Sequence, residues 1–383
     1  MISVMHSRLT SYILSKELRH RNISCSCFME FLVLSNCRPG SGWDTYASSL
    51  MAVKSSSFSI KLLNLFDSHR SGACPCNDVF RPRTIDILGR NLNPSYLEVV
   101  GRVLPSIYFH DLIRSIKSER SNGLVLHYSY HLLPILGKPS NDIVTIHDLT
   151  VVSKLHESSG LKRLYAQSLM RKYSSFKNII TVSRHTKELL EGIGFNGSIE
   201  AIYPPASPGF YPVVDKSSLR EDLGLPQDKF LVLSVGNDRP WKNLERAFKS
   251  VETLGSDYMF VRVGRGVRNE RVFLNVDQKK LNMLYNASDV LLFPSLEEGF
   301  GFPLVEAFSV GLPTVVSDID IFREIGDGAS IFVNPYDISS ISEGIVTAIY
   351  DSKSLRNMSL AKSRNFTVDR FNKNMESYYK SIL

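Results

Sequence analysis

The sequence predicts an α/β protein made of two successive domains, each built around a parallel sheet. Short apolar runs alternate with longer amphipathic stretches along the 383 residues, which is typical of parallel α/β units. The chain is also long for a single hydrophobic core. Near its middle, segment 203–212 holds four prolines within nine residues, which can continue neither a helix nor a central strand. We interpret this segment as the linker between the domains.

Buried strands are predicted where apolar and β-branched residues cluster between turn signals. In the first half these runs are Phe31–Ser35, Ile60–Leu65, Leu124–Tyr128, Ile143–Ile146 and Ile179–Val182. In the second half they are Phe230–Val235, Met259–Val263, Val290–Phe293, Thr314–Ser317 and Ile331–Val333. A helix is predicted over Arg184–Ile193, since Ser183 can cap its start and Gly194 its end. Another helix is expected to begin near Asn243, and the tail from Ser339 is predicted to be helical.

The folded part is expected to begin near Met29, where residues 29–36 have the pattern of an opening buried strand. Residues 1–28 carry four Lys/Arg, one acid and many serines but no long apolar core, which argues against a secretory signal peptide. We expect a disordered extension over 1–28, a first domain over 29–205 and a second over 206–383. The last helix is expected to pack back on the first domain. Ligands of such sheets bind at the carboxyl ends of the strands, in the cleft between domains.

The net charge of +7 is unevenly placed, with +9 in residues 1–210 and −2 in residues 211–383. The basic half can meet an anionic partner such as a lipid phosphate, a membrane surface or a nucleic acid, or it can be a solvated surface. No apolar run approaches the roughly 18 residues of a membrane-spanning helix. The five cysteines form neither paired C-x-x-C motifs nor a disulfide framework, so we expect a cytoplasmic protein.

The most informative stretch runs from Asn286 to Pro335 and begins as strand, glycine-bearing loop and helix. Gly299 and Gly301 let backbone amides approach a ligand closely. The helix that follows offers amide groups and the positive end of its dipole to an anion such as a diphosphate.

Two acids, Glu298 and Glu306, stand eight residues apart in this stretch. Carboxylates accept directional hydrogen bonds from sugar hydroxyls. From spacing alone, Glu298 can equally be a solvated loop acid, and Glu306 can cap its own helix.

Segment 296–307, LEEGFGFPLVEA, closely resembles the E-x7-E signature of retaining glycosyltransferases of family 4. The resemblance extends over the flanking segments 284–289, 311–318, 323–325 and 333–335. It implies the GT-B architecture: two Rossmann-like domains with parallel sheets facing a central cleft, an acceptor domain first and a nucleotide-sugar donor domain second.

The resemblance also assigns roles in the donor domain. It implies that Glu298 contacts the hydroxyls of the donor sugar and that Glu306 holds the ribose of the nucleotide. Gly299, Phe300 and Gly301 would form the donor-binding loop between the two acids.

A second cluster, 234–244, combines a strand end, a turn at Gly236 and Lys242 at a helix start. A cation there can neutralise a phosphate leaving group. The family has Lys-Asn at this point, so Lys242 is the predicted phosphate-binding residue. Many relatives carry arginine directly after the glycine. Here that position is Asn237, and Arg239 is the nearest arginine, which makes it a secondary candidate.

Two sites are predicted in the first domain. His147 and Asp148 follow a buried strand and match a T-x-H-D segment of the family, whose histidine lies near the donor sugar. A lone histidine there would otherwise be structural. After the first strand, Gly40, Ser41 and Gly42 resemble the amino-terminal loop near the donor phosphates and the acceptor, although the usual paired glycines are interrupted.

Segment 160–177 is predicted to be a basic helix with the apolar stripe Leu161, Leu164, Tyr165, Leu169 and Tyr173. An ordinary amphipathic helix is the first interpretation. Peripheral docking on an anionic membrane is the second, and it would suit a lipid-linked acceptor.

The resemblance implies transfer with retention at the anomeric carbon, without metal or cofactor. The letters of a metal-binding D-x-D occur at Asp318-Ile319-Asp320, but this segment matches a strand and loop of the family. Lys242 and helix amides would stabilise the leaving diphosphate. The expected partners are a nucleotide-sugar carrying a hexose-type sugar and a glycan, lipid-linked or small-molecule acceptor, with no nucleic acid.

Three other interpretations stay open. A nucleotide-sugar epimerase can use the same architecture. A degenerate, non-catalytic homologue would bind sugar without transferring it. A dinucleotide-dependent oxidoreductase needs G-x-G-x-x-G after a strand, and Gly264-Arg265-Gly266 lacks the third glycine.

Overall fold

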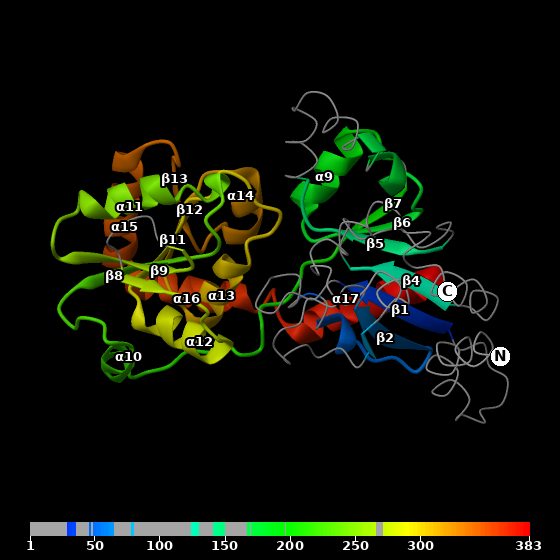
Figure 1. Cartoon of the computed structure of the whole chain (residues 1–383), viewed down its shortest axis with the longest axis horizontal. Coiled ribbons are helices and arrows are strands. Elements are labelled where there is room, and N and C mark those ends of the chain that lie inside the picture. Colours follow the sequence, from blue (N-terminus) through cyan, green and yellow to red (C-terminus); the bar gives the residue numbers. More distant parts are fainter. Residues whose placement is uncertain are drawn as a thin grey trace, which may run out of the picture.

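A computed structural model of the chain shows two α/β domains side by side (Figure 1). The structure describes residues 29–35, 46, 49–64, 78–79, 124–129, 141–149, 167–168, 170–195, 197–265 and 271–383. The predicted extension 1–28 and the loop Gly40-Ser41-Gly42 lie outside the described residues, as do the five cysteines and residues 160–166 and 169 of the basic helix. Tyr173, the described member of the apolar stripe of that helix, is buried.

The first domain is built on a seven-stranded parallel sheet with the order β3-β2-β1-β4-β5-β6-β7. Its strands are β1 (Met29–Ser35), β2 (Phe58–Asn64), β3 (Asp78–Val79), β4 (Leu124–Tyr128), β5 (Ile143–Ile146), β6 (Asn178–Thr181) and β7 (Ser198–Ala201). Helix α9 (Arg184–Gly192) follows β6 and begins at the N-cap Ser183, whose side chain accepts a hydrogen bond from the Thr186 amide.

The second domain has a six-stranded parallel sheet with the order β10-β9-β8-β11-β12-β13. Its strands are β8 (Phe230–Val235), β9 (Tyr258–Val263), β10 (Arg271–Phe273), β11 (Val290–Phe293), β12 (Thr314–Ser317) and β13 (Ile331–Val333). Its helical elements are α10 (Lys216–Leu223), the 3₁₀ turn η2 (Pro240–Lys242), α11 (Leu244–Glu252), α12 (Gln278–Ala287), α13 (Phe302–Val310), α14 (Asp320–Gly326), α15 (Ile338–Tyr350) and α16 (Ser352–Ser363).

The strand orders confirm the predicted pair of doubly wound sheets. In each sheet the order reverses once, between β1 and β4 in the first domain and between β8 and β11 in the second. Ligands of such sheets bind beyond the carboxyl ends of the two strands that flank this reversal. In the second domain, the fold therefore places the expected ligand site at the loops that follow β8 and β11.

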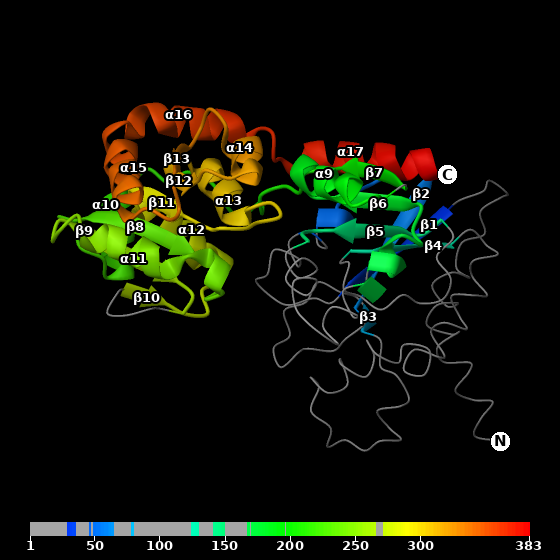
Figure 2. The same ribbon diagram turned by 90° about the horizontal axis from the view of Figure 1, so that it is seen from above.

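The chain crosses between the domains twice. The proline-rich segment links β7 to α10, and a second crossing joins α16 to the last helix, α17 (Val368–Ile382). The two crossings are tied together, because the Ala206 amide donates to the Phe366 carbonyl at 3.0 Å. Helix α17 returns to the first domain and lies beside its sheet (Figures 1 and 2), where the Tyr379 and Phe31 ring centroids are 4.2 Å apart.

A buried polar chain anchors α17 to this sheet. The Tyr379 hydroxyl lies 2.7 Å from Nδ1 of His127, and Nε2 of His127 lies 2.7 Å from Oγ1 of Thr145. Tyr46 extends the chain, with its hydroxyl 3.0 Å from the same Thr145 oxygen. Burial lowers the pKa of His127 to about 3, with a smaller contribution from His147. The imidazole is therefore neutral, and its two nitrogens act as one donor and one acceptor.

Replacing Tyr379 by phenylalanine is expected to lower the free energy of unfolding by about 1–3 kcal/mol, because one nitrogen of His127 would be left unpaired in the core. Tyr378→Phe is the matched control. The Tyr378 hydroxyl is buried on the same helix without a hydrogen-bond partner among the described residues. Urea unfolding followed by circular dichroism compares the two variants. Equal midpoints for both would contradict the anchoring role.

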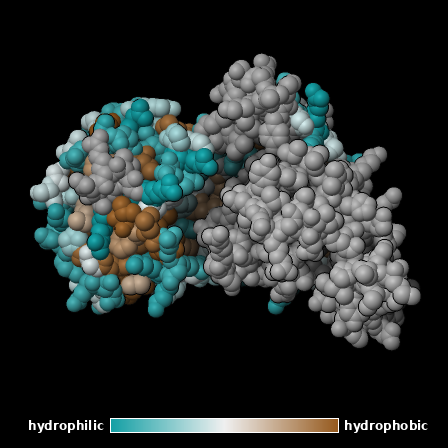
Figure 3. Space-filling view, viewed as in Figure 1, coloured by the Kyte–Doolittle hydropathy of each residue, from teal (hydrophilic) through white to brown (hydrophobic). Residues whose placement is uncertain are grey.

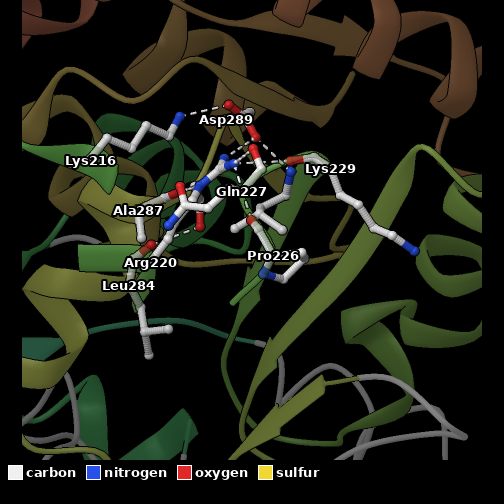
Figure 4. Close-up of polar contacts among 10 residues, drawn as sticks. Lys216, Arg220, Pro226, Gln227, Lys229, Leu284, Ala287 and Asp289 are labelled. Atoms are coloured by element: carbon white, nitrogen blue, oxygen red, sulfur yellow. Dashed lines mark hydrogen bonds and ion pairs between the residues drawn. The ribbon is translucent and has the colours of Figure 1, made fainter. Parts of the chain in front are cut away.

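A buried arginine braces the amino ends of the second sheet (Figure 4). Arg220 on α10 donates to the Ala287 carbonyl at 3.0 Å and to the Lys229 carbonyl at 3.1 Å. Its guanidinium also pairs with Asp289 at 2.7 Å, and Lys216 reaches the other oxygen of the same carboxylate at 2.6 Å. This network fixes α10, and with it the end of the proline-rich crossing, to the domain that follows.

The exposed face of the second domain is mixed in character. Hydrophobic residues gather over the region of β9 and α12 and are surrounded by hydrophilic ones (Figure 3). Within the described part of the chain, no helix is both long and apolar enough to cross a membrane.

Candidate active site

Lys242 and Glu298 come together at the carboxyl edge of the second sheet. Lys242 ends the turn η2 after β8, and Glu298 lies in the loop after β11, so they stand on the two strands that flank the reversal of strand order. The Lys242 ammonium forms an ion pair with Oε1 of Glu298, and the side chains are 14% and 13% exposed. The ammonium also lies 5.0 Å from the centroid of the Phe293 ring. A fixed cation beside a carboxylate is thus held where the fold places ligands.

Backbone and side-chain contacts hold Lys242 in this position. The next residue, Asn243, has a left-handed backbone (φ 58°) and is buried. Its side-chain nitrogen, Nδ2, donates to the carbonyls of Pro294 at 3.1 Å and Pro335 at 2.7 Å, which follow β11 and β13. The Leu296 amide donates to the Trp241 carbonyl at 2.7 Å. The Lys-Asn pair therefore joins the loops of three strands.

Arg262 supports the turn after β8, and the sequence analysis missed it. This arginine is fully buried in β9, and one of its terminal nitrogens donates to the carbonyls of Gly236 at 2.6 Å and Asn237 at 2.9 Å. Gly236 itself has φ +142°, which favours glycine. The signal in the sequence was a single charge within an otherwise apolar strand, YMFVRV.

Glu306 lies one turn into α13 and is coupled to a buried tyrosine. The Tyr285 hydroxyl donates to Oε2 of Glu306 at 2.7 Å. Burial raises the pKa of Glu306 to about 7, and the hydrogen bond from Tyr285 partly opposes this shift. Its second oxygen, Oε1, is the atom that remains to meet a ligand hydroxyl. Tyr285 on α12 was not predicted, because nothing local in the sequence links it to α13.

The loop between the two acids leads directly into α13. Gly301 is the N-cap of this helix with φ +98° and gives it no side-chain cap, so the helix start is open to an anion. The Phe300 side chain, which we expected to bind the donor, is only 3% exposed and packs 6.3 Å from Tyr203 and 5.8 Å from Phe366, measured between ring centroids. Tyr203 and Phe366 belong to the two crossings between the domains. The Phe300 ring therefore faces the hinge, and a donor contact would fall to its backbone.

The first domain reaches this loop through His147. A Cβ atom placed on Gly299 would lie 1.9 Å from the His147 carbonyl oxygen and 2.8 Å from Cβ of Asp148, so the two loops touch. The His147 ring is 5% exposed, and its Nε2 donates to the Ser129 carbonyl at 2.8 Å. Because Nε2 carries this proton, Nδ1 is the acceptor in the neutral ring. Tyr46 packs edge-on to the ring, with centroids 4.9 Å apart.

The side chains of the secondary candidate Arg239 and of Asp318 have partners of their own. Arg239 is exposed, and its guanidinium lies 5.8 Å from the centroid of the Trp241 ring. Asp318, in the D-x-D letters, forms a two-point ion pair with Arg323 at 2.6 and 2.8 Å, which lowers the pKa of its carboxyl. Among the residues that the structure describes, no group of three or more His, Cys, Asp or Glu side chains is arranged to hold a metal ion.

A cavity of about 530 Å³ opens at the opposite edge of the second sheet, between α10, α12 and α16. Lys216, Asp289, Pro313 and Arg356 are among its lining residues, and Asp289 and Pro313 directly precede β11 and β12. This cavity lies at the amino ends of the strands. We base the active-site assignment on the carboxyl ends, where Lys242 meets Glu298 and the loop into α13 begins.

Comparison with known proteins agrees with this fold. The profile of the family described as Glycosyl transferases group 1 matches residues 215–364, from the N-cap of α10 to the end of α16. The structure of Anabaena Alr3699/HepE in complex with UDP and glucose superposes with a TM-score of 0.68 at 16% identity, covering 92% of this chain and 100% of that one. WaaG, a glycosyltransferase involved in lipopolysaccharide biosynthesis, gives a TM-score of 0.66 at 15% identity over 91% of this chain and 98% of that one. These structural matches show that the chain has the GT-B fold.

Two relatives found by sequence similarity are named as sugar transferases. The O-antigen chain mannosyltransferase RfbU of Salmonella typhimurium is 24% identical over 256 residues, which cover 62% of this chain and 69% of that protein. The UDP-Gal:alpha-D-GlcNAc-diphosphoundecaprenol alpha-1,3-galactosyltransferase of Escherichia coli is 34% identical over 187 residues, or 43% of this chain and 47% of that protein. Residues 215–364 of the chain are therefore similar to glycosyltransferases of group 1, and the chain has the GT-B fold.

Proposed function

We propose that the chain is a retaining, metal-independent hexosyltransferase that moves a sugar from a nucleotide-sugar to a glycan, lipid-linked or small-molecule acceptor. The observation that carries the proposal is the ion pair of Lys242 with Glu298 at the carboxyl edge of the second sheet, in the loop that leads into the helix of Glu306. The contact of Gly299 with His147 adds the first domain, as a two-substrate reaction requires.

Each polar side chain has a role that suits its surroundings. Lys242 binds the donor phosphates and stabilises the charge that develops on the leaving diphosphate. Glu298 accepts hydrogen bonds from sugar hydroxyls, and its ion pair with Lys242 keeps the carboxylate at the junction of sugar and phosphate. Glu306 accepts from a ribose hydroxyl through Oε1, while Tyr285 holds its other oxygen.

The transfer step can proceed with retention if the acceptor attacks from the side of the leaving group. A new bond forms between the acceptor oxygen and the anomeric carbon as the bond from that carbon to the phosphate oxygen breaks. The departing phosphate oxygen takes the acceptor proton, so no protein nucleophile or metal is required. Closure of the domains would exclude water and limit hydrolysis of the donor.

The names of similar proteins support the choice of substrates. HepE is known in complex with UDP-glucose, RfbU is a mannosyltransferase, and the E. coli relative transfers galactose to a sugar on diphosphoundecaprenol. A hexose donor and a lipid-linked acceptor are therefore the first substrates to test. Such an acceptor also fits the basic first half of the chain and an enzyme that works in the cytoplasm at the membrane surface.

Incubating the purified chain with UDP-, GDP- and ADP-sugars, with and without a diphosphoundecaprenol-linked sugar, tests the proposal. We expect release of the nucleotide diphosphate with at least one donor, faster with acceptor, unchanged by a metal chelator, and a product with the anomeric configuration of the donor. Conversion of the donor alone to an isomeric nucleotide-sugar would indicate an epimerase. Binding without turnover would indicate a non-catalytic homologue.

Donor binding is expected to depend on pH through Glu306. Its pKa of about 7 means that the acid is mostly protonated below neutral pH and is a carboxylate above it. Since the carboxylate offers more acceptor positions, the KM for donor should fall as the pH rises from 6 to 8. In Glu306→Gln the KM should stay near its low-pH value at every pH. A wild-type KM that rises over the same interval would contradict this role.

A further inference from the structure

The first turn of α9, in the first domain, is completed by a residue of the second domain. The amides of Arg184 and His185 donate to Oε1 and Oε2 of Glu324, at 2.8 and 2.7 Å. Glu324 belongs to α14, and its side chain is only 8% exposed. Amides at a helix start have no partner within the helix, and the helix dipole favours an anion there. One carboxylate of the second domain thus satisfies two such amides of the first.

The same helix start also contacts the donor-binding loop. Ser183 Oγ, which accepts from the Thr186 amide at 3.1 Å, donates to the Gly299 carbonyl at 2.8 Å. Gly299 is the residue whose backbone meets the carbonyl of His147. The start of α9 therefore lies against α14 on one side and the donor loop on the other, and both contacts join the two domains.

We propose that Glu324 is a positioning residue that clasps the two domains closed by capping α9, and so holds His147 against the donor loop during transfer. The role in transfer rests on the proposed function, whereas the clasp itself can be measured without it. Arg184 adds a weaker contact, with Nε 3.8 Å from Oε1 of Glu324 and a largely exposed side chain. The backbone amides therefore carry the clasp, and the identity of residue 184 matters less than the carboxylate.

Glu324→Gln tests the clasp with little change in shape. The glutamine keeps one acceptor oxygen but presents an NH₂ group, which cannot accept, to the second amide. We expect about a tenfold fall in kcat, a donor affinity within about twofold of the wild type and a larger share of donor lost to hydrolysis, because water enters an open cleft. Glu188→Gln is the matched control, since it removes the same charge from the exposed surface of α9.

Small-angle scattering of the full chain with saturating UDP gives a readout independent of turnover. We expect a larger radius of gyration for Glu324→Gln than for the wild type and Glu188→Gln, and Glu324→Ala should expand at least as much. Unchanged dimensions in both Glu324 variants, or an unchanged ratio of hydrolysis to transfer in the active enzyme, would overturn the clasp. If the wild type transfers no sugar from any donor while the Glu324 variants still expand, the proposed function fails and the clasp stands.

Discussion

Replacing Lys242 by alanine is expected to lower kcat by about a hundredfold to a thousandfold, the range seen when one fixed electrostatic donor is removed from an active site. The ammonium lies at the carboxyl edge of β8, within an ion pair of Glu298 and above the ring of Phe293. No other described cation occupies this point, since Arg239 points to Trp241 and Arg262 is committed to the turn after β8. The charge on the leaving diphosphate would therefore lose its main counterion.

The control for this variant is Lys249→Ala on the neighbouring helix α11. Lys249 forms an exposed ion pair with Glu245 at 3.3 Å, which is expected to contribute little to stability. Initial rates at saturating donor and acceptor, with circular dichroism to confirm folding, compare the two variants. A folded Lys242→Ala protein with nearly normal turnover would remove the assigned role.

Gly299→Ala is expected to lower transfer by about a hundredfold, because misplacement by about 1 Å can cost that much in an oriented reaction. The added Cβ would lie 1.9 Å from the His147 carbonyl oxygen and 2.9 Å from its carbonyl carbon, so the loops must separate. The backbone of Gly299 is not left-handed, so its conformation is one that alanine can adopt without backbone strain. The effect would therefore come from the contact between domains.

Donor binding separates this effect from a general loss of structure. We expect Gly299→Ala to bind UDP-sugar or GDP-sugar with an affinity within a few-fold of the wild type, since Lys242, Glu298 and Glu306 all lie in the second domain. Gly192→Ala, on α9, is the control because an added Cβ there meets nothing within 4 Å. Wild-type transfer rates in Gly299→Ala would show that the contact with His147 is not needed for the reaction.

Local patterns in the sequence predicted most of the fold. The central strands carry continuous apolar runs such as VLLF in β11 and TVVS in β12, and these were identified close to their observed bounds. Three short strands at or near the sheet edges were missed: β3, β7 and β10, with two, four and three residues. They are too short or too mixed to show a period, and pairing with a neighbouring strand defines them.

The residues of the candidate site also fall into those that local sequence patterns predicted and those that they did not. Lys242, Glu298 and Glu306 were predicted because each lies in a contiguous motif that resembles a known family. Arg262 and Tyr285 were not, since their roles come from contacts across 26 and 21 residues. Glu324 was noted within a family-like segment, but its contact with α9 spans 140 residues. The contact between Glu324 and α9 depends on how the two domains pack together, and local sequence patterns do not predict that.

The central claim is that a nucleotide-sugar binds at the carboxyl edge of the second sheet, gripped by Lys242, Glu298 and Glu306. The most direct test is thermal unfolding of the full chain with UDP-, GDP- and ADP-sugars, because a ligand that binds only the folded state raises the melting temperature. We predict a rise with at least one nucleotide-sugar in the wild type and little or none in Glu306→Ala. The claim would be contradicted if no nucleotide-sugar raised the melting temperature of the wild type. It would also be contradicted if Glu306→Ala and Lys242→Ala showed the same rise as the wild type.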